Sequence, residues 1–244
     1  MERAAVVLAA GLGTRLRPLT DYRPKALCPV GGVPLVDANL ARARRHASRV
    51  AVNIHHHRDL LVEHLSGRAH LSIEQEPLGT AGAIGNLKRW IGGRDVLVVN
   101  ADVWHADGLD DLVAAWDGSR PRLLVVPDAE RPDFDGRWRY TGACLLPAAV
   151  AAALPATFCG LYDSVFSRMP LEFVESAAPF FDCGTLRDYH AANMAASGGL
   201  TVIGDGARVL GTATRCVLWP GVTVAEGEEL IDAVRPADGV TLQA

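Results

Sequence analysis

The sequence predicts an α/β fold built in three layers. Strand-like and helix-like segments alternate along most of its 244 residues. The apolar run Ala4–Leu8 ends directly in a glycine loop, and Val96–Val99 supplies four consecutive apolar residues, as a strand covered on both faces requires. We therefore predict a mostly parallel, Rossmann-like sheet with its ligand-binding loops at the carboxyl ends of the strands.

Composition limits the classes of partner. The net charge is −4, from 24 Lys and Arg against 28 Asp and Glu, so no general basic field favours nucleic acid. No apolar run reaches the roughly 18 residues of a membrane span, and we expect no membrane association. The chain enters a strand without a cleavable signal pattern, which predicts a cytoplasmic location. Five widely spaced cysteines without a C-x-x-C pair argue against a disulfide framework and a zinc knuckle.

The glycine loop lies within Leu8–Leu27, which reads L-A-A-G-L-G-T-R-L-R-P-L-T-D-Y-R-P-K-A-L. Gly11 and Gly13 have no Cβ, so the backbone there can turn sharply and approach a phosphate. The cations nearby are Arg15, Arg17, Arg23 and Lys25, which suit a polyphosphate. A dinucleotide fingerprint wants a third glycine and a Walker loop wants Gly-Lys-Ser/Thr, and both are absent. An ordinary strand-to-helix turn with two glycines stays open.

The further elements T-R, P-x-T and P-K-x-L make this stretch resemble the signature of sugar-1-phosphate nucleotidyltransferases. The resemblance implies transfer of a nucleotidyl group from a nucleoside triphosphate to a sugar 1-phosphate, with release of pyrophosphate. It places Ala10, Gly11, Gly13 and Thr14 on the nucleotide. Arg15 and Lys25 become the catalytic cations, with Arg15 on the leaving pyrophosphate and Lys25 on the α-phosphate or the sugar phosphate.

A second ligand-facing loop follows the predicted strand His70–Glu74. Thr80 is predicted to be the N-cap of a helix running to about Ile91. Small residues at Gly79, Ala81 and Gly82 would let a flat base lie against the backbone. The stretch resembles the nucleotide-base loop of the same family, which implies nucleotide contacts for Glu74, Gly79 and Thr80.

Two aspartates are candidate magnesium ligands. Asp102 ends the predicted strand Asp95–Asp102, where open α/β sheets place ligands, and a carboxylate there can hold Mg²⁺ on phosphate oxygens. Asp182 lies in Phe180–Thr185, which resembles the family's D-x-G-T motif. The segment ending at Asp102 resembles the N-G-D motif, although Ala101 replaces the glycine. Either aspartate would instead serve as a helix cap if the metal role is wrong.

The sugar pocket is less clearly marked. Tyr140-Thr141-Gly142 resembles the stretch that lines the sugar pocket in the family, which implies sugar contacts for Tyr140, Gly142 and also Asn100. The Glu-Lys-Pro that many relatives carry next is missing. By charge alone, the candidates for the sugar phosphate are Arg137, Arg139 and Arg168.

The nucleobase is predicted from Glu74. Guanine presents two adjacent donors, N1–H and N2–H₂, that a carboxylate with two acceptor oxygens can receive. This favours GTP and, with the resemblance, an activity like that of guanylyltransferases acting on mannose 1-phosphate. The alternatives are thymidylyltransferases and the uridylyltransferases that act on N-acetylated sugar phosphates, since Gln75 offers uracil both a donor and an acceptor.

The pattern changes at Leu200, so we predict a nucleotidyltransferase domain over 1–199 and a short tail over 200–244. Apolar residues recur six apart with a one-residue slip, at Ile203, Val209, Cys216 and Val222. This predicts a short left-handed hexapeptide β-helix that packs on the catalytic domain or on a second subunit of a homo-oligomer. No predicted site residue lies in the tail, so truncation before Leu200 is expected to spare the reaction.

Two other functions compete with nucleotidyl transfer. A non-catalytic, nucleotide-sugar-binding subunit of the same fold would be indicated by loss of Lys25 or an aspartate, but these residues are present. A nicotinamide-dependent oxidoreductase is disfavoured by the missing third glycine.

Overall fold

The computed structural model describes residues 2–106 and 108–244. The chain forms two compact units. The first comprises residues 2–12, 36–101 and 108–178, and the second comprises Gly13–Leu35, Asp102–Ala106 and Pro179–Ala244. The predicted boundary at residue 199 falls inside the second unit, and the division into 1–199 and 200–244 stays a prediction.

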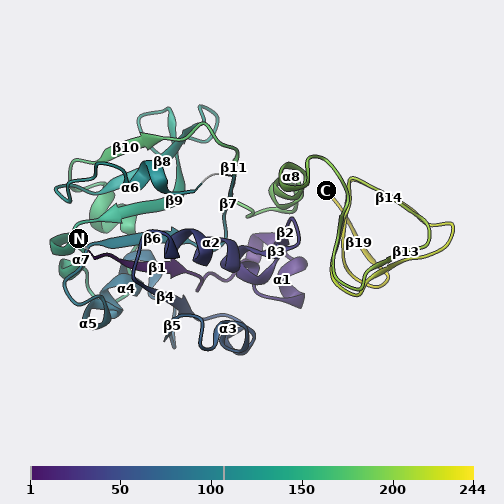
Figure 1. Cartoon of the computed structure of the whole chain (residues 1–244), viewed down its shortest axis with the longest axis horizontal. Coiled ribbons are helices and arrows are strands. Elements are labelled where there is room, and N and C mark those ends of the chain that lie inside the picture. Colours follow the sequence, from purple (N-terminus) through teal and green to yellow (C-terminus); the bar gives the residue numbers. More distant parts are fainter. Residues whose placement is uncertain (1, 107) are drawn as a thin grey trace. The chain divides into compact units, whose positions relative to one another are not determined.

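A seven-stranded sheet forms the centre of the first unit, in the order β10-β8-β9-β6-β1-β4-β5 (Figure 1). Every neighbouring pair is parallel except the two pairs that involve β9. The predicted α/β class with a mostly parallel sheet is therefore confirmed. The strands are β1 (Ala4–Leu8), β4 (Arg49–Ile54), β5 (His70–Ile73), β6 (Val96–Asn100), β8 (Arg122–Pro127), β9 (Trp138–Leu146) and β10 (Glu172–Glu175).

Both faces of this sheet are covered, which explains why β1 and β6 are apolar throughout. Alternate residues of β1, such as Val6, join a core with α4 (Gly79–Asn86), α5 (Lys88–Ile91) and α7 (Ala148–Ala153). Residues on the other face, such as Val7, are equally buried. Figure 1 shows α2 (Leu35–Arg44) and α6 (Asp110–Val113) on the opposite side of the sheet from α4 and α5. The remaining helices of this unit are α3 (Arg58–Leu65) and the single π-turn Tyr162–Phe166.

The second unit contains the segment that carries most of the signature. Two short 3₁₀ turns, Thr14–Leu16 and Lys25–Leu27, flank α1 (Leu19–Tyr22). Two small antiparallel ladders follow, β2 (Pro29–Val30) with β3 (Val33–Pro34), and β7 (Trp104–His105) with β11 (Phe180–Phe181). The longest helix is α8 (Leu186–Ser197).

The start and the end of α8 are set by Thr185 and Gly198. Thr185 is the N-cap, and its Oγ1 accepts the backbone N–H of Asp188 at 3.1 Å. Gly198 ends the helix with φ +65°, the left-handed conformation that favours glycine.

The tail consists of short strands in small sheets. Parallel pairs place Val202 opposite Val217, Arg208 opposite Thr223, and Thr212 opposite Glu229. A left-handed hexapeptide β-helix is not confirmed by these pairings alone. The strands are β12 (Val202–Ile203), β13 (Arg208–Val209), β14 (Thr212–Thr214), β15 (Val217–Leu218), β16 (Thr223–Val224), β17 (Glu229–Ile231), β18 (Ala233–Ala237) and β19 (Val240–Gln243).

The helix predicted from Thr80 to Ile91 differs in detail. It begins at Gly79 with Leu78 at the N-cap position, and it breaks at Leu87 into α4 and α5. Thr80 is therefore not the N-cap. Its Oγ1 instead accepts the backbone N–H of Leu161 at 2.8 Å, a tertiary contact that local spacing does not reveal.

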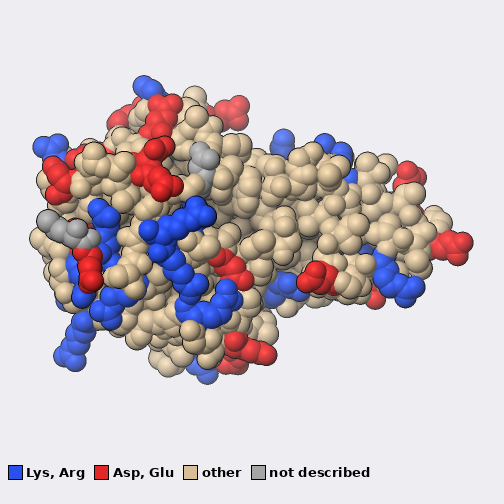
Figure 2. Space-filling model, viewed as in Figure 1, with Lys and Arg blue, Asp and Glu red and all other residues tan. Residues whose placement is uncertain are grey.

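The surface carries both signs of charge. In Figure 2, basic and acidic side chains are intermixed over the visible face. Within residues 2–106 and 108–244, no helix combines the length and the apolar character needed to cross a bilayer.

Candidate active site

Lys25 lies at the centre of a charged cluster in the second unit. Its Nζ is 2.8 Å from Oδ2 of Asp102 and 3.5 Å from Oδ1 of Asp182. The Lys25 side chain is only 7% exposed, and a buried ammonium requires such partners. Arg15 joins the group, with Nη2 4.0 Å from Oδ2 of Asp182. We call these four residues the Lys25 cluster.

The electrostatics of the cluster keep Lys25 charged. Burial lowers the pKa of Lys25, but the carboxylates of Asp102 and Asp182 raise it by more, so its pKa lies above the usual value. Lys25 is therefore a fixed cation at neutral pH. A permanent cation suits an electrostatic role rather than proton transfer.

The glycine loop packs closely on this lysine. Gly13 has φ +64°, and a Cβ at Gly13 would lie 2.9 Å from Cγ2 of Thr20 and 3.2 Å from Cβ of Lys25. Thr20 Oγ1 also donates to the Gly13 carbonyl at 3.1 Å. Thus Gly13 is needed both for its backbone angle and for its close approach to Lys25.

The other predicted loop residues are more open. Gly11 is exposed, with no atom within 4 Å of a Cβ built on it, and Thr14 is exposed as well. Only Gly13 of the two loop glycines has a positive φ. Ala10 is half-buried and follows β1 by two residues. The Arg15 side chain is 73% exposed, so it can turn toward a ligand.

The two aspartates suit a hard divalent cation. Their side chains are 39% and 29% exposed, so a cation can reach them despite the buried Lys25 beside them. The alternative role of a helix cap does not apply to Asp182, because Thr185 is the N-cap of α8. Asp102 accepts a hydrogen bond from the ammonium of Lys25. Among the described residues, no group of three or more His, Cys, Asp and Glu gathers as a metal site. Two carboxylates are nonetheless enough for Mg²⁺ when phosphate oxygens and waters supply the other ligands.

A buried hydrogen-bond network joins two loops of the first unit. Asn53 Oδ1 accepts the backbone N–H of Ala9 at 2.8 Å, and Asn53 Nδ2 donates to Glu74 Oε1 at 2.8 Å. Glu74 Oε2 accepts the backbone N–H of Leu78 at 2.9 Å. Glu74 is 4% exposed, and both of its oxygens are engaged within the protein. The sequence interpretation missed Asn53, for which the available signal is an amide at the end of an apolar strand.

The glycines of the predicted base loop lie against another segment of the chain. A Cβ at Gly79 would lie 2.5 Å from the Cys159 carbonyl oxygen, and one at Gly82 would lie 2.2 Å from that of Thr157. Gly82 and Ala81 are buried. Gly79 and Gly82 therefore let the backbone of 157–159 pack closely against α4. Contact of this loop with a nucleobase stays a prediction.

Asn100 and Gly142 are brought together on neighbouring strands. Gly142 has φ +82°, and a Cβ there would lie 2.9 Å from Cβ of Asn100. The Tyr140 ring lies edge-on to Phe166, with centroids 5.5 Å apart, and packs against the core of the first unit, and its contact with a sugar stays a prediction. Its side chain supports the sheet, and burial raises the pKa of its hydroxyl well above the usual value.

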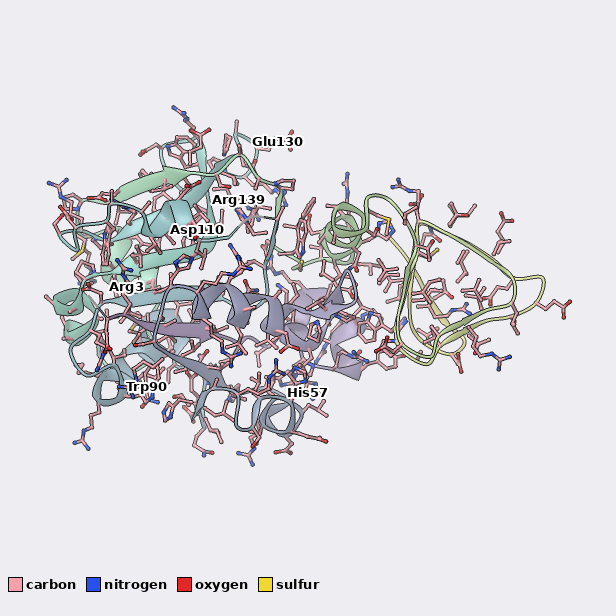
Figure 3. All side chains as sticks on the ribbon, viewed as in Figure 1. Arg3, His57, Trp90, Asp110, Glu130 and Arg139 are labelled. Carbon is pink, nitrogen blue, oxygen red and sulfur yellow. The ribbon has the colours of Figure 1, made fainter. Side chains whose placement is uncertain are left out.

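The three candidates for the sugar phosphate are already engaged. Arg139, labelled in Figure 3, has Nη1 3.5 Å from Oδ2 of Asp128 and is only 14% exposed. Arg137 lies over the ring of Trp138, and Arg168 donates from Nε to the Asp163 carbonyl at 2.6 Å. The choice among these three arginines stays open.

Comparison with known proteins agrees with this arrangement. Residues 4–132, just over half of the chain, match the model of the nucleotidyl transferase family. The protein belongs to this family. Its α/β fold and the Lys25 cluster, in which cations lie beside two carboxylates, are consistent with that membership. The resemblance inferred from Leu8–Leu27 is confirmed.

Among its relatives, the N-acetylmuramate alpha-1-phosphate uridylyltransferase of Caulobacter vibrioides is 41% identical over 138 residues, covering 51% of this chain and 57% of the relative. The enzyme of the same name from Neisseria meningitidis serogroup B is 38% identical over 108 residues, covering 41% of this chain and 46% of the relative. The match thus spans about half the length of these curated relatives. The crystal structure described as mannose-1-phosphate geranyltransferase from Thermus thermophilus shares the fold, with TM-score 0.73 and 18% identity over 99% of this chain and 94% of that one.

Proposed function

We propose that this protein transfers a nucleotidyl group from a nucleoside triphosphate to a sugar 1-phosphate, releasing pyrophosphate and forming a nucleoside diphosphate sugar. The observation that carries the proposal is the Lys25 cluster, in which a buried cation meets two accessible carboxylates. Membership of the nucleotidyl transferase family supports it. A cluster of this kind stabilises charge that develops on phosphates and requires no protein base.

The chemistry follows from the charges of the substrates. The phosphate of a sugar 1-phosphate has a second pKa near about 6, so its oxygen is already anionic at neutral pH. That oxygen attacks the α-phosphorus in line, and the bond from the α-phosphorus to the bridging oxygen of the β-phosphate breaks. We assign Lys25 to the α-phosphate or sugar phosphate, and the exposed Arg15 to the leaving pyrophosphate.

Asp102 and Asp182 would hold the divalent cation, for which we propose Mg²⁺. When bound, such a cation polarises phosphate oxygens and neutralises the charge that develops on them. The two carboxylates have the hard oxygen donors that it prefers. Lys25 balances their charge within the protein itself, so the two acidic side chains can lie close together around its buried ammonium.

The remaining site assignments stay proposals. We place Ala10, Gly11, Gly13, Thr14, Glu74, Gly79 and Thr80 on the nucleotide side, and Asn100, Tyr140 and Gly142 on the sugar side. The network from Ala9 through Asn53 and Glu74 to Leu78 supports the first set, because it fixes both loops of the nucleotide side. We also propose that the parallel strand pairs of the tail form a short left-handed hexapeptide β-helix. Homo-oligomerisation and a cytoplasmic location stay predictions.

Two nucleobases are candidates. The sequence favours GTP through the paired acceptors of Glu74. A specific observation favours UTP as the second candidate: both Glu74 oxygens are engaged within the protein, and two relatives are named as uridylyltransferases acting on N-acetylmuramate 1-phosphate.

The test is pyrophosphate release across a grid of GTP, UTP, dTTP, ATP and CTP against several sugar 1-phosphates, with N-acetylmuramate 1-phosphate and mannose 1-phosphate among them.

The chain has only two lysines, which provides a matched control. Lys25→Met should abolish most turnover, and Lys88→Met, on the exposed face of α5, should leave it unchanged. A folded wild-type protein that releases no pyrophosphate with any pair would refute the proposal and favour a binding subunit.

A further inference from the structure

Trp219 connects the tail to the segment that carries Lys25. It follows β15 directly and is fully buried. It shares a hydrophobic core with Leu16 and Cys28, which lie on either side of α1, and with Cys183, which follows Asp182. The tail therefore shares a core with the segments on which the Lys25 cluster is built.

The ring of Trp219 contacts the two residues that precede Pro24 and Lys25. The guanidinium carbon of Arg23 lies 4.2 Å from the ring centroid, which is a cation–π arrangement. Tyr22 meets the same ring edge-on, with centroids 6.5 Å apart and planes at 84°. The indole is thus in contact with the segment just before Lys25 on two sides.

The indole N–H of Trp219 extends the contact to α8. Nε1 donates to the hydroxyl of Tyr189 at 3.0 Å, and that hydroxyl donates to the Pro29 carbonyl at 2.5 Å. Tyr189 lies in the first turn of α8, shortly after Asp182 in the chain. Trp219 therefore contacts the residues just before Lys25 and also α8, the helix that follows Asp182.

We infer that Trp219 is a positioning residue for the Lys25 cluster and that the tail, through Trp219, is part of the machinery that places Lys25. The inference deepens the proposed function and rests on it for its effect on turnover. Its effect on Lys25 itself is independent of that function, so the two are tested separately.

The first measurement reads Lys25 directly. Because the chain has only Lys25 and Lys88, mass spectrometry after brief treatment with an amine-acetylating reagent gives the labelling rate of each. In the wild type, Lys25 should label far more slowly than exposed Lys88. Trp219→Leu should raise the ratio of the Lys25 rate to the Lys88 rate about fivefold or more, as expected when a buried site opens locally.

Trp116→Leu is the matched control. Trp116 is also buried, and its Nε1 also donates a hydrogen bond, in this case to the carbonyl of Arg120 at 2.9 Å. An arginine, Arg3, likewise lies over its ring, 5.7 Å from the centroid. It belongs to the first unit, away from the Lys25 cluster in the chain. It should lower the melting temperature as Trp219→Leu does, while leaving the labelling ratio and kcat unchanged.

The second measurement is turnover, made well below each variant's melting temperature. Trp219→Leu should lower kcat about tenfold with a smaller change in KM, and Trp219→Phe should restore most of it, since the ring face for Arg23 remains. The double variant of Lys25→Met with Trp219→Leu should be no slower than Lys25→Met alone, because Trp219 acts through Lys25.

The outcomes separate the two proposals. A changed labelling ratio in a protein without nucleotidyl transfer would refute the proposed function and retain the positioning role. If the wild-type protein catalyses nucleotidyl transfer but Trp219→Leu and Trp116→Leu have the same labelling ratio, the positioning role is refuted. It is also refuted if the double variant of Lys25→Met with Trp219→Leu is slower than Lys25→Met alone. If Trp219→Leu does not fold, Arg23→Met, which removes the cation from the face of the Trp219 ring, decides the question by the same ratio, because an unchanged ratio would refute the positioning role.

Discussion

At the scale of single residues, the two carboxylates and the lysine of the Lys25 cluster depend on one another. Asp102 and Asp182 surround a cation that is almost completely buried. A buried charge that loses its partners is destabilising, whereas a neutral amide keeps the shape and part of the hydrogen bonding. This makes asparagine the informative substitution, because it tests the charge of each carboxylate with little change in packing.

We expect Asp102→Asn and Asp182→Asn each to reduce turnover by at least about a hundredfold, as loss of an electrostatic contact to a developing charge does. The fold should survive, with a melting temperature close to that of the wild type. The measurement is pyrophosphate release as a function of Mg²⁺ concentration, with circular dichroism as the check on folding. Asp59→Asn, at an exposed position of α3, serves as the control. Near-wild-type turnover at saturating Mg²⁺ in either site variant would exclude that aspartate from the metal site.

The raised pKa of Lys25 predicts a pH dependence of stability. A group whose pKa is higher in the folded than in the unfolded protein stabilises the fold fully below its unfolded pKa, about 10.4 for lysine. The contribution is lost as the pH rises through the higher folded value. The melting-temperature difference between wild type and Lys25→Met should therefore be constant from neutral pH to about 10 and should shrink above it. A difference that already falls between pH 8 and 9 would contradict a raised pKa.

Substitution of Glu74 should lower activity equally with every nucleoside triphosphate rather than with one nucleobase alone. Its two oxygens accept from Asn53 and from the Leu78 backbone, so a glutamine there turns one amide N–H₂ toward a donor. Leaving a buried donor unmatched costs about 1–3 kcal/mol. We expect Glu74→Gln to lower kcat/KM for GTP, UTP and dTTP to a similar extent, about 5- to 150-fold, because both loops are loosened. A loss confined to GTP would show instead that the carboxylate reads guanine directly.

At the scale of elements, the strands and their loops were largely predictable from the sequence. Continuous apolar runs gave the central strands, including β1 and β6, because burial on both faces leaves no polar positions. The strand β10 (Glu172–Glu175) was missed, since an edge strand with glutamate at both ends has no apolar signal. Asp102 and Asp182 were found as candidates because motif residues at the ends of elements are readable in the sequence.

Contacts between segments far apart in the chain were not predictable. The backbone of 157–159 approaches Gly79 and Gly82, and nothing in the periodicity of either segment indicates the other. The glycines recur at intervals of three, at Gly79, Gly82 and Gly85, but we used only the small size of Gly79, Ala81 and Gly82 and assigned the space to a flat base. A stripe of glycines on one helix face equally indicates the close approach of another backbone.

This contact predicts an inverted response to alanine at Gly82. In an open helix, replacing glycine by alanine usually stabilises by about 1 kcal/mol. Here the new Cβ would lie 2.2 Å from the Thr157 carbonyl oxygen, so the backbone must shift, and overpacking costs about 1–3 kcal/mol. Gly82→Ala should lower the free energy of unfolding in urea by that amount. Gly160→Ala, with its nearest atom 3.6 Å away on the Asp163 side chain, should change it by less than about 0.5 kcal/mol. Equal free energies of unfolding for the two variants would mean that the backbone of 157–159 can move away from α4 at little cost.

At the scale of the whole molecule, the tail is the part whose role changes most between sequence and structure. The sequence places no site residue beyond Leu200, and from that alone truncation should spare the reaction. The structure shows that Cys216, Val217, Trp219 and other tail residues share one core with the signature segment and α8. Sequence patterning identifies where the pattern changes, but it does not reveal which apolar faces pack together.

We therefore expect removal of residues 200–244 to inactivate the protein. Fully burying one large apolar side chain contributes about 1.5–3 kcal/mol, so losing several at once exceeds much of the roughly 5–15 kcal/mol of a typical domain. The truncated chain should show Lys25 labelling as fast as Lys88 and should expose apolar surface that promotes aggregation. Truncation before Gly239, which removes β19 but none of the fully buried residues of this core, is the control and should retain turnover and slow Lys25 labelling. A soluble chain of residues 1–199 with wild-type turnover would show that the signature segment folds without the tail, and that the predicted boundary at residue 199 is a domain boundary after all.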